Sequence, residues 1–166
     1  NDNNKNDVQE VCQRLYIVTL LFLYAIMIIA VDFDGTIVEH KYPKIGNEVP
    51  FATDTLKELI KDGHQLILWS VREDDLLQEA VNWCHNHGVD FWAVNKDYPE
   101  EEQSKNNHFS RKLKVDMFID DRNVGGLPDW GTIYHMIKHN ETWESIRYNS
   151  SSAYQEPKRR KHWWNF

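Results

Sequence analysis

Cysteine is scarce in this sequence, and the two residues present do not form a ligand pattern. Cys12 and Cys84 belong to neither a CxxC motif nor a Cys/His spacing of the kind that binds metals. We therefore expect free thiols in a reducing compartment, and a cytoplasmic protein. Cys84 falls on the apolar side of an expected helix, where it would behave as a small hydrophobic residue.

Positive charge is also in deficit. The chain has 26 acidic against 19 basic residues, a formal net charge of −7. Because binding to a phosphate backbone draws on a basic surface, this balance argues against a general nucleic-acid binder. It allows a phosphorylated small molecule, or a phosphorylated polymer end, in a local positive pocket. Hydrophobic residues make up 41% of the 166 residues, which suits one globular domain with a core.

The sequence lacks a long, unambiguous membrane-spanning run. Residues 15–31 are apolar apart from one threonine and two tyrosines, a length at the lower edge for a span. Residues 28–31 are needed as a strand, and the apolar residues that remain before them are too few for a membrane-spanning helix. We therefore expect residues 1–26 to be an appendage to a domain that starts at Met27. A membrane anchor, with contact through residues 15–29, and a buried extra helix are the alternatives.

Short apolar segments alternate with amphipathic ones along the rest of the chain. We expect helices over 51–63, 73–88 and 129–139, and strands within 28–31, 64–70, 89–95 and 113–121. The strands are continuously apolar, which is typical of a sheet buried on both faces. The pattern predicts an α/β fold, a Rossmann-like parallel sheet with helices on both faces. The expected domain covers residues 27–140, and residues 141–166 form a polar, then basic tail.

Polar side chains follow three of the expected strands. Asp32 and Asp34 come after the first, Ser70 after the second, and Asp120 and Asp121 after the fourth. Ligands bind at the carboxyl ends of the strands in an open parallel sheet, so we expect these residues to share one site. Four carboxylates together raise each other's pKa values unless a cation lies among them. Oxygen ligands alone favour Mg²⁺.

These motifs resemble a known family. The sequence DFDGT at 32–36, a strand-end serine, a lysine and IDD at 119–121 resemble the haloacid dehalogenase superfamily of phosphohydrolases, over about residues 27–137. The resemblance implies a Mg²⁺-dependent phosphomonoester hydrolase. It implies that Asp32 is the nucleophile that forms an aspartyl-phosphate, and that Asp34 is the general acid and base.

The resemblance also implies roles for the other strand-end residues. Ser70 would donate a hydrogen bond to the transferring phosphoryl group. Asp120 and Asp121 would hold Mg²⁺ together with Asp32 and the backbone carbonyl of Asp34.

The position of the active-site lysine is open. Lys112 precedes Asp120 by a spacing that resembles short members of the family, and we choose it. Lys96 and Lys114 are the alternatives. Arg72 and Arg122 each follow a strand-end motif closely, and either could contact a leaving group or form a surface ion pair.

Family members often carry a cap domain, and this sequence has no room for one. The connections at 38–50 and 96–111 are too short to fold separately. We therefore expect an open site that relies on loop 38–50, a neighbouring subunit in an oligomer, or a large substrate to exclude water.

Two other kinds of protein compete with a phosphatase. One is a non-catalytic or regulatory phosphate-binding module of the same fold, which would be membrane-associated if the apolar N-terminal segment anchors it. The other is a phospho-accepting receiver domain, which places its phospho-accepting Asp after the third strand. Here the third strand ends in Asn95, which argues against a receiver.

Overall fold

A computed structural model describes residues 26–102, 112–142 and 144–146. The expectations for residues 1–25, including the membrane anchor and Cys12, lie outside this part, as does most of the C-terminal tail. The chain divides into two compact units at Leu127 and Pro128, and each is described by itself. The first unit contains β1 (Ile28–Val31), α2 (Ala52–Lys61), β2 (Gln65–Leu68), α3 (Asp74–Asn86), β3 (Ala93–Val94) and β4 (Met117–Ile119), and the second contains α4 (Trp130–His139).

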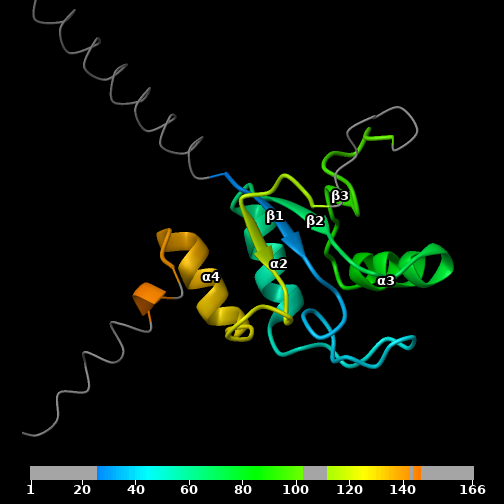
Figure 1. Cartoon of the computed structure of the whole chain (residues 1–166), viewed down its shortest axis with the longest axis horizontal. Coiled ribbons are helices and arrows are strands. Elements are labelled where there is room, and N and C mark those ends of the chain that lie inside the picture. Colours follow the sequence, from blue (N-terminus) through cyan, green and yellow to red (C-terminus); the bar gives the residue numbers. More distant parts are fainter. Residues whose placement is uncertain (1–25, 103–111, 143, 147–166) are drawn as a thin grey trace, which may run out of the picture. The chain divides into compact units, whose positions relative to one another are not determined.

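The four strands form one parallel sheet in the order β3-β2-β1-β4 (Figure 1). Ile29 of β1 lies opposite Leu66 of β2 and Met117 of β4. Residues 29–31 are fully or almost fully buried, as a continuously apolar central strand should be. The predicted α/β fold with a parallel sheet is therefore confirmed.

The strand order reverses at β1. The chain passes from β1 to β2 and β3 on one side, and β4 then pairs on the other side of β1. Such a reversal opens a crevice at the carboxyl ends of the two flanking strands, where open α/β sheets bind ligands. Asp32, which directly follows β1, lies at this crevice.

Helices α2 and α3 lie on the same side of the sheet. Leu56 and Leu59 of α2 are fully buried, and Lys57 lies against Gly88 just after α3. This agrees with the right-handed crossover that joins parallel strands. On the sheet, Ala30, Ile67 and Ala93 form a core cluster with Leu113 from the segment before β4.

The observed strands are shorter than the sequence predicts. The expected strand 89–95 gives only the two residues of β3, and 113–121 gives the three of β4. Backbone pairing nevertheless continues past β3, because the Asn95 N–H donates to Leu68 O at 2.8 Å. No separate cap domain appears in residues 26–102 and 112–127, in agreement with the prediction.

Two expectations about single segments can be compared with the structure. Cys84 is buried in α3, and burial raises the pKa of its thiol to about 12, so it acts as a small apolar residue. None of the described helices has the length and apolar character that a membrane-spanning segment requires.

Candidate active site

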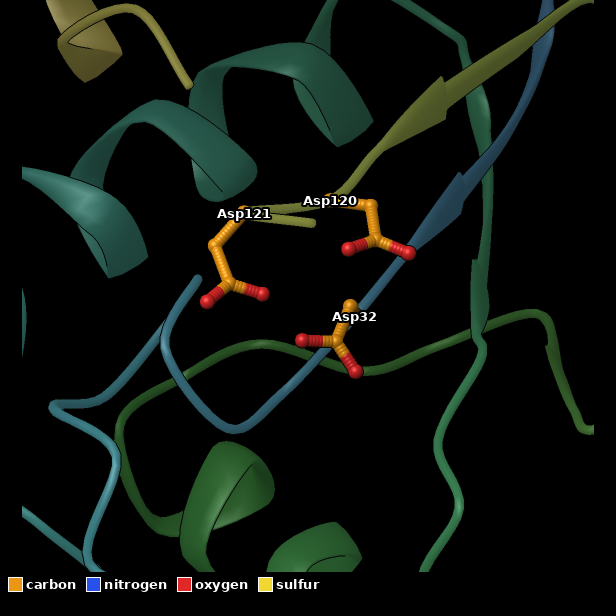
Figure 2. Close-up of side chains that lie close together, drawn as sticks. All are labelled: Asp32, Asp120 and Asp121. Atoms are coloured by element: carbon orange, nitrogen blue, oxygen red, sulfur yellow. The ribbon is translucent and has the colours of Figure 1, made fainter. Parts of the chain in front are cut away.

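Three carboxylates converge where β1 and β4 end. Asp32 follows β1, and Asp120 and Asp121 follow β4. One carboxylate oxygen from each lies within 4.8 Å of the others, and Figure 2 shows the three side chains turned toward one another. The structure thus brings together three of the four acids that the sequence predicts as a metal site.

The turn after β1 holds this cluster in place. Gly35 has φ +98°, and a Cβ there would lie 2.3 Å from Oδ2 of Asp121. Only glycine allows both this backbone conformation and so close an approach. The Thr36 hydroxyl donates to Oδ2 of Asp32 at 3.1 Å and accepts from the Asp121 N–H at 3.0 Å. The Gly-Thr pair of the motif therefore connects the end of β1 to the end of β4.

The cluster is electrostatically strained when no cation is bound. Burial raises the pKa of Asp32 to about 6, and the negative charges of Asp120 and Asp121 act in the same direction. Hydrogen bonds from the Phe33 backbone and the Thr36 hydroxyl only partly offset this rise in pKa. Charges that repel in this way are stabilised by a cation placed among them.

One oxygen of the cluster also points to a cation. Oδ1 of Asp121 is buried and has no hydrogen-bond partner among the described residues. A buried carboxylate oxygen without a donor is costly, and a metal ion would satisfy it. All the available ligand atoms are oxygens, which suits Mg²⁺ better than a softer metal. The donor set fits the predicted ion.

Asp34 is held apart from the cluster by a buried ion pair. Its carboxylate is 5% exposed and accepts from Nε of Arg72 at 2.6 Å and from Nη2 at 2.7 Å. Arg72 is completely buried, and the contact with Asp34 raises the pKa of the guanidinium. The backbone carbonyl of Asp34 lies 3.4 Å from Nδ1 of His40.

Sequence reasoning missed this role of Arg72. It left a surface ion pair and a leaving-group contact as equal alternatives, whereas the side chain is buried and pairs with a predicted catalytic acid. The arginine is 38 residues from Asp34 in the sequence. Its position two residues after the strand-end Ser70 was the only available signal.

Ser70 lies at the end of β2, and Asn95 fixes its backbone. The Ser70 N–H donates to Oδ1 of Asn95 at 2.8 Å, and Nδ2 of Asn95 donates to Ser70 O at 2.9 Å. Oγ of Ser70 accepts from the Arg72 N–H at 3.2 Å. Asn95 was not predicted as a site residue. It directly follows β3 and has a positive φ of 52°, a conformation that asparagine tolerates better than most residues.

None of the three candidate lysines lines the cavity. The Lys112 ammonium lies 6.0 Å from the ring centroid of Phe118, and Lys96 donates to the Pro99 carbonyl. Lys114 is positioned through its backbone N–H, which donates to Asp97 at 2.7 Å. The role of Lys112 stays a prediction, because residues 103–111 before it lie outside the described part.

An open cavity of about 710 Å³ lies over the carboxyl ends of the strands. Its wall contains four of the predicted residues and several others that the sequence did not single out. The lining residues are Asp32, Asp34, His40, Tyr42, Trp69, Ser70, Val71, Glu73, Asn95, Asp120 and Arg122.

Comparison with known proteins gives a relative without a stated activity. No family model and no curated protein matches the chain. A solved structure, described as that of a conserved protein coded by a locus from Bacteroides thetaiotaomicron, matches with 64% identity and a TM-score of 0.68. The match covers 73% of this chain and 97% of that one. The chain therefore belongs to the same family as this conserved Bacteroides protein.

Proposed function

We propose that this protein is a Mg²⁺-dependent phosphomonoester hydrolase of the haloacid dehalogenase type, working through an aspartyl-phosphate on Asp32. The observation that carries the proposal is the convergence of Asp32, Asp120 and Asp121, where a buried oxygen of Asp121 has no hydrogen-bond partner among the described residues. The cluster lies at the strand-order reversal, where open α/β sheets bind ligands.

The metal would be held by a few oxygen donors. Asp32, Asp120 and Asp121 would supply carboxylates, and Asp34 would supply its backbone carbonyl. Bound there, Mg²⁺ would neutralise the charge that otherwise keeps an anionic nucleophile from an anionic phosphate.

The chain's own residues would carry the covalent steps. An Asp32 oxygen attacks phosphorus, the bond from phosphorus to the alcohol oxygen breaks, and an acyl phosphate forms on Asp32. Asp34 enters the cycle with a proton and gives it to the departing oxygen. Water then attacks the acyl phosphate while Asp34 takes its proton, which releases inorganic phosphate and restores Asp32.

The two hydrogen bonds from Arg72 leave positions open on the Asp34 oxygens, where Asp34 would carry the proton that it gives and takes. Each carboxylate oxygen has two lone-pair positions, and Arg72 occupies one on each. Asp34 lines the cavity, so the other positions can meet the leaving oxygen. Ser70, at the next strand end, would donate a hydrogen bond to the phosphoryl group in transfer.

The same ion pair favours a second candidate function. A carboxylate locked by a buried arginine, in a cavity that none of the described lysines lines, also suits a non-catalytic phosphate-binding module. Such a module would bind phosphate with Mg²⁺ and release no product.

Phosphate release separates the two functions. We expect the full chain to hydrolyse a chromogenic aryl phosphate with Mg²⁺, and to lose this activity with a chelator or in Asp32→Asn. Asp90→Asn is the matched control, because Asp90 is an exposed acid whose ion-pair partner is the exposed His85. Mg²⁺-dependent binding of phosphate without any turnover would favour the module instead.

A further inference from the structure

The cavity has room for more than a phosphoryl group. Its volume of about 710 Å³ lies within the range of roughly 300–1,000 Å³ that holds drug-sized ligands. Beside the carboxylates, its wall carries the apolar side chains of Tyr42, Trp69 and Val71. The leaving group of a phosphomonoester would meet this part of the wall.

Tyr42 presents an accessible ring on this wall. It belongs to the loop at 39–48, shown in cyan in Figure 1, and is 50% exposed. The guanidinium of Arg72 lies over the ring, 5.4 Å from its centroid. Tyr42 is also one of the residues that line the cavity.

Arg72 also fixes the backbone beside Tyr42. It donates from Nη1 to Pro43 O at 3.0 Å and from Nη2 to Lys44 O at 3.2 Å. Because Arg72 is itself buried and paired with Asp34, the loop is tied to the floor of the site.

The two arms of the loop are joined as well. The Glu39 N–H donates to Asn47 O at 2.8 Å, and the Val49 N–H donates to Ile37 O at 2.9 Å. A Cβ on Gly46 would lie 2.1 Å from Glu39 O, so the arms approach as closely as glycine permits. An aromatic side chain held on such a loop loses little conformational freedom when a ligand stacks on it.

We propose that Tyr42 determines substrate specificity by stacking on a planar aromatic ring in the leaving group. The inference rests on the proposed phosphatase function and names its substrate class, a phosphomonoester whose alcohol carries a ring of nucleobase size. An aromatic side chain can stack on any of the bases, because each base has a flat π-face. Such stacking contributes enough to change affinity by about tenfold or more.

Two phosphomonoesters, one that carries a nucleobase and one that lacks it, test this inference. Adenosine 5′-monophosphate and ribose 5-phosphate share the same reacting phosphate and the same primary alcohol oxygen. With Mg²⁺ and the full chain, we expect kcat/KM to be about tenfold or more higher for the nucleotide, mainly through a lower KM. Tyr42→Leu should lower kcat/KM for the nucleotide much more than for ribose 5-phosphate and so remove this preference, and Tyr42→Phe should keep it.

Tyr98→Leu is the control, because Tyr98 is a similarly exposed tyrosine that does not line the cavity. Equal kcat/KM values for the two substrates, or an equal loss for both in Tyr42→Leu, would overturn the inference while leaving the phosphatase proposal intact. If neither substrate is hydrolysed, the aryl phosphate still tests the phosphatase proposal, and calorimetric binding of the two compounds with Mg²⁺ tests the stacking role. Tighter binding of the nucleotide that depends on Tyr42 supports the stacking role, and equal or absent binding refutes it.

Discussion

Gly35 combines a backbone conformation that favours glycine with a close approach to the acidic cluster. With φ +98° and Asp121 Oδ2 at 2.3 Å from an added Cβ, Gly35→Ala adds strain and displaces a carboxylate of the proposed metal site. We expect a loss of about 1–3 kcal/mol in unfolding free energy and a weaker affinity for Mg²⁺, measured by urea unfolding and calorimetry.

Gly125→Ala separates these two effects. Gly125 has nearly the same φ, +99°, but nothing lies within 4 Å of an added Cβ. It should share the backbone strain and keep the affinity for Mg²⁺. Equal affinities in the two variants would show that Gly35 does not position Asp121.

The pKa of Asp32 makes stability depend on pH. Its pKa of about 6 in the folded chain exceeds the ordinary 3.8, so the folded state binds more protons between these values. The unfolding free energy without metal should therefore fall as pH rises from about 4 through about 6, and then level off. Asp32→Asn should remove this component, as measured by denaturant unfolding across pH.

Added Mg²⁺ should change the same curve. A cation among the carboxylates favours the ionised form of Asp32, so its stabilisation should be larger above pH 6 than below it. A stabilisation by Mg²⁺ that is as large at pH 5 as at pH 7.5 would contradict a site built on Asp32.

At the scale of elements, the Asp34–Arg72 pair joins the turn after β1, the end of β2 and the 39–48 loop. Removing Arg72 leaves a buried carboxylate without a partner, so Arg72→Met should cost about 3–5 kcal/mol of unfolding free energy. The double variant with Asp34→Asn should lose less than the sum of the two single losses. Urea unfolding of all four proteins measures this coupling.

An exposed arginine gives the comparison. Arg122 lines the cavity but is exposed, and Arg122→Met should change the unfolding free energy by no more than about 0.5 kcal/mol. Additive losses for Arg72 and Asp34 would mean that the pair contributes no coupling.

Much of the element order is predictable because each element carries a local signal. Apolar runs mark the strands, and helical spacing of Leu56 and Leu59 marks α2. Strand length is less predictable. The sequence predicts a strand over the seven residues 89–95, but β3 has only two residues, because pairing depends on the neighbouring strand more than on residue propensity.

The candidate site, like the fold, could be predicted only in part. Asp32, Asp120 and Asp121 could be placed together because parallel strands share an edge. Two other interactions could not be predicted, because each joins segments far apart in sequence. These are the ion pair of Asp34 with Arg72 and the hydrogen bonds of the Asn95 side chain to the Ser70 backbone. The predicted lysine remains outside the described cavity wall.

At the scale of the whole chain, the formal net charge is −7, whereas the substrate that we propose is an anion. This combination requires local positive charge, which a bound cation, Arg122 at the cavity wall and the predicted lysine would supply. It suits a small phosphorylated substrate better than a polyanion, and it is the reason for the strict metal dependence we expect.

The central claim is that Asp32 carries the phosphoryl group during turnover, and rapid acid quenching tests it most directly. The full chain is mixed with a substrate bearing radiolabelled phosphate and Mg²⁺, and quenched within the first turnover. We predict a protein-bound label that hydroxylamine removes, as an acyl phosphate requires, and that is absent from Asp32→Asn. Turnover without a covalent label, or a label that persists in Asp32→Asn, would contradict the account.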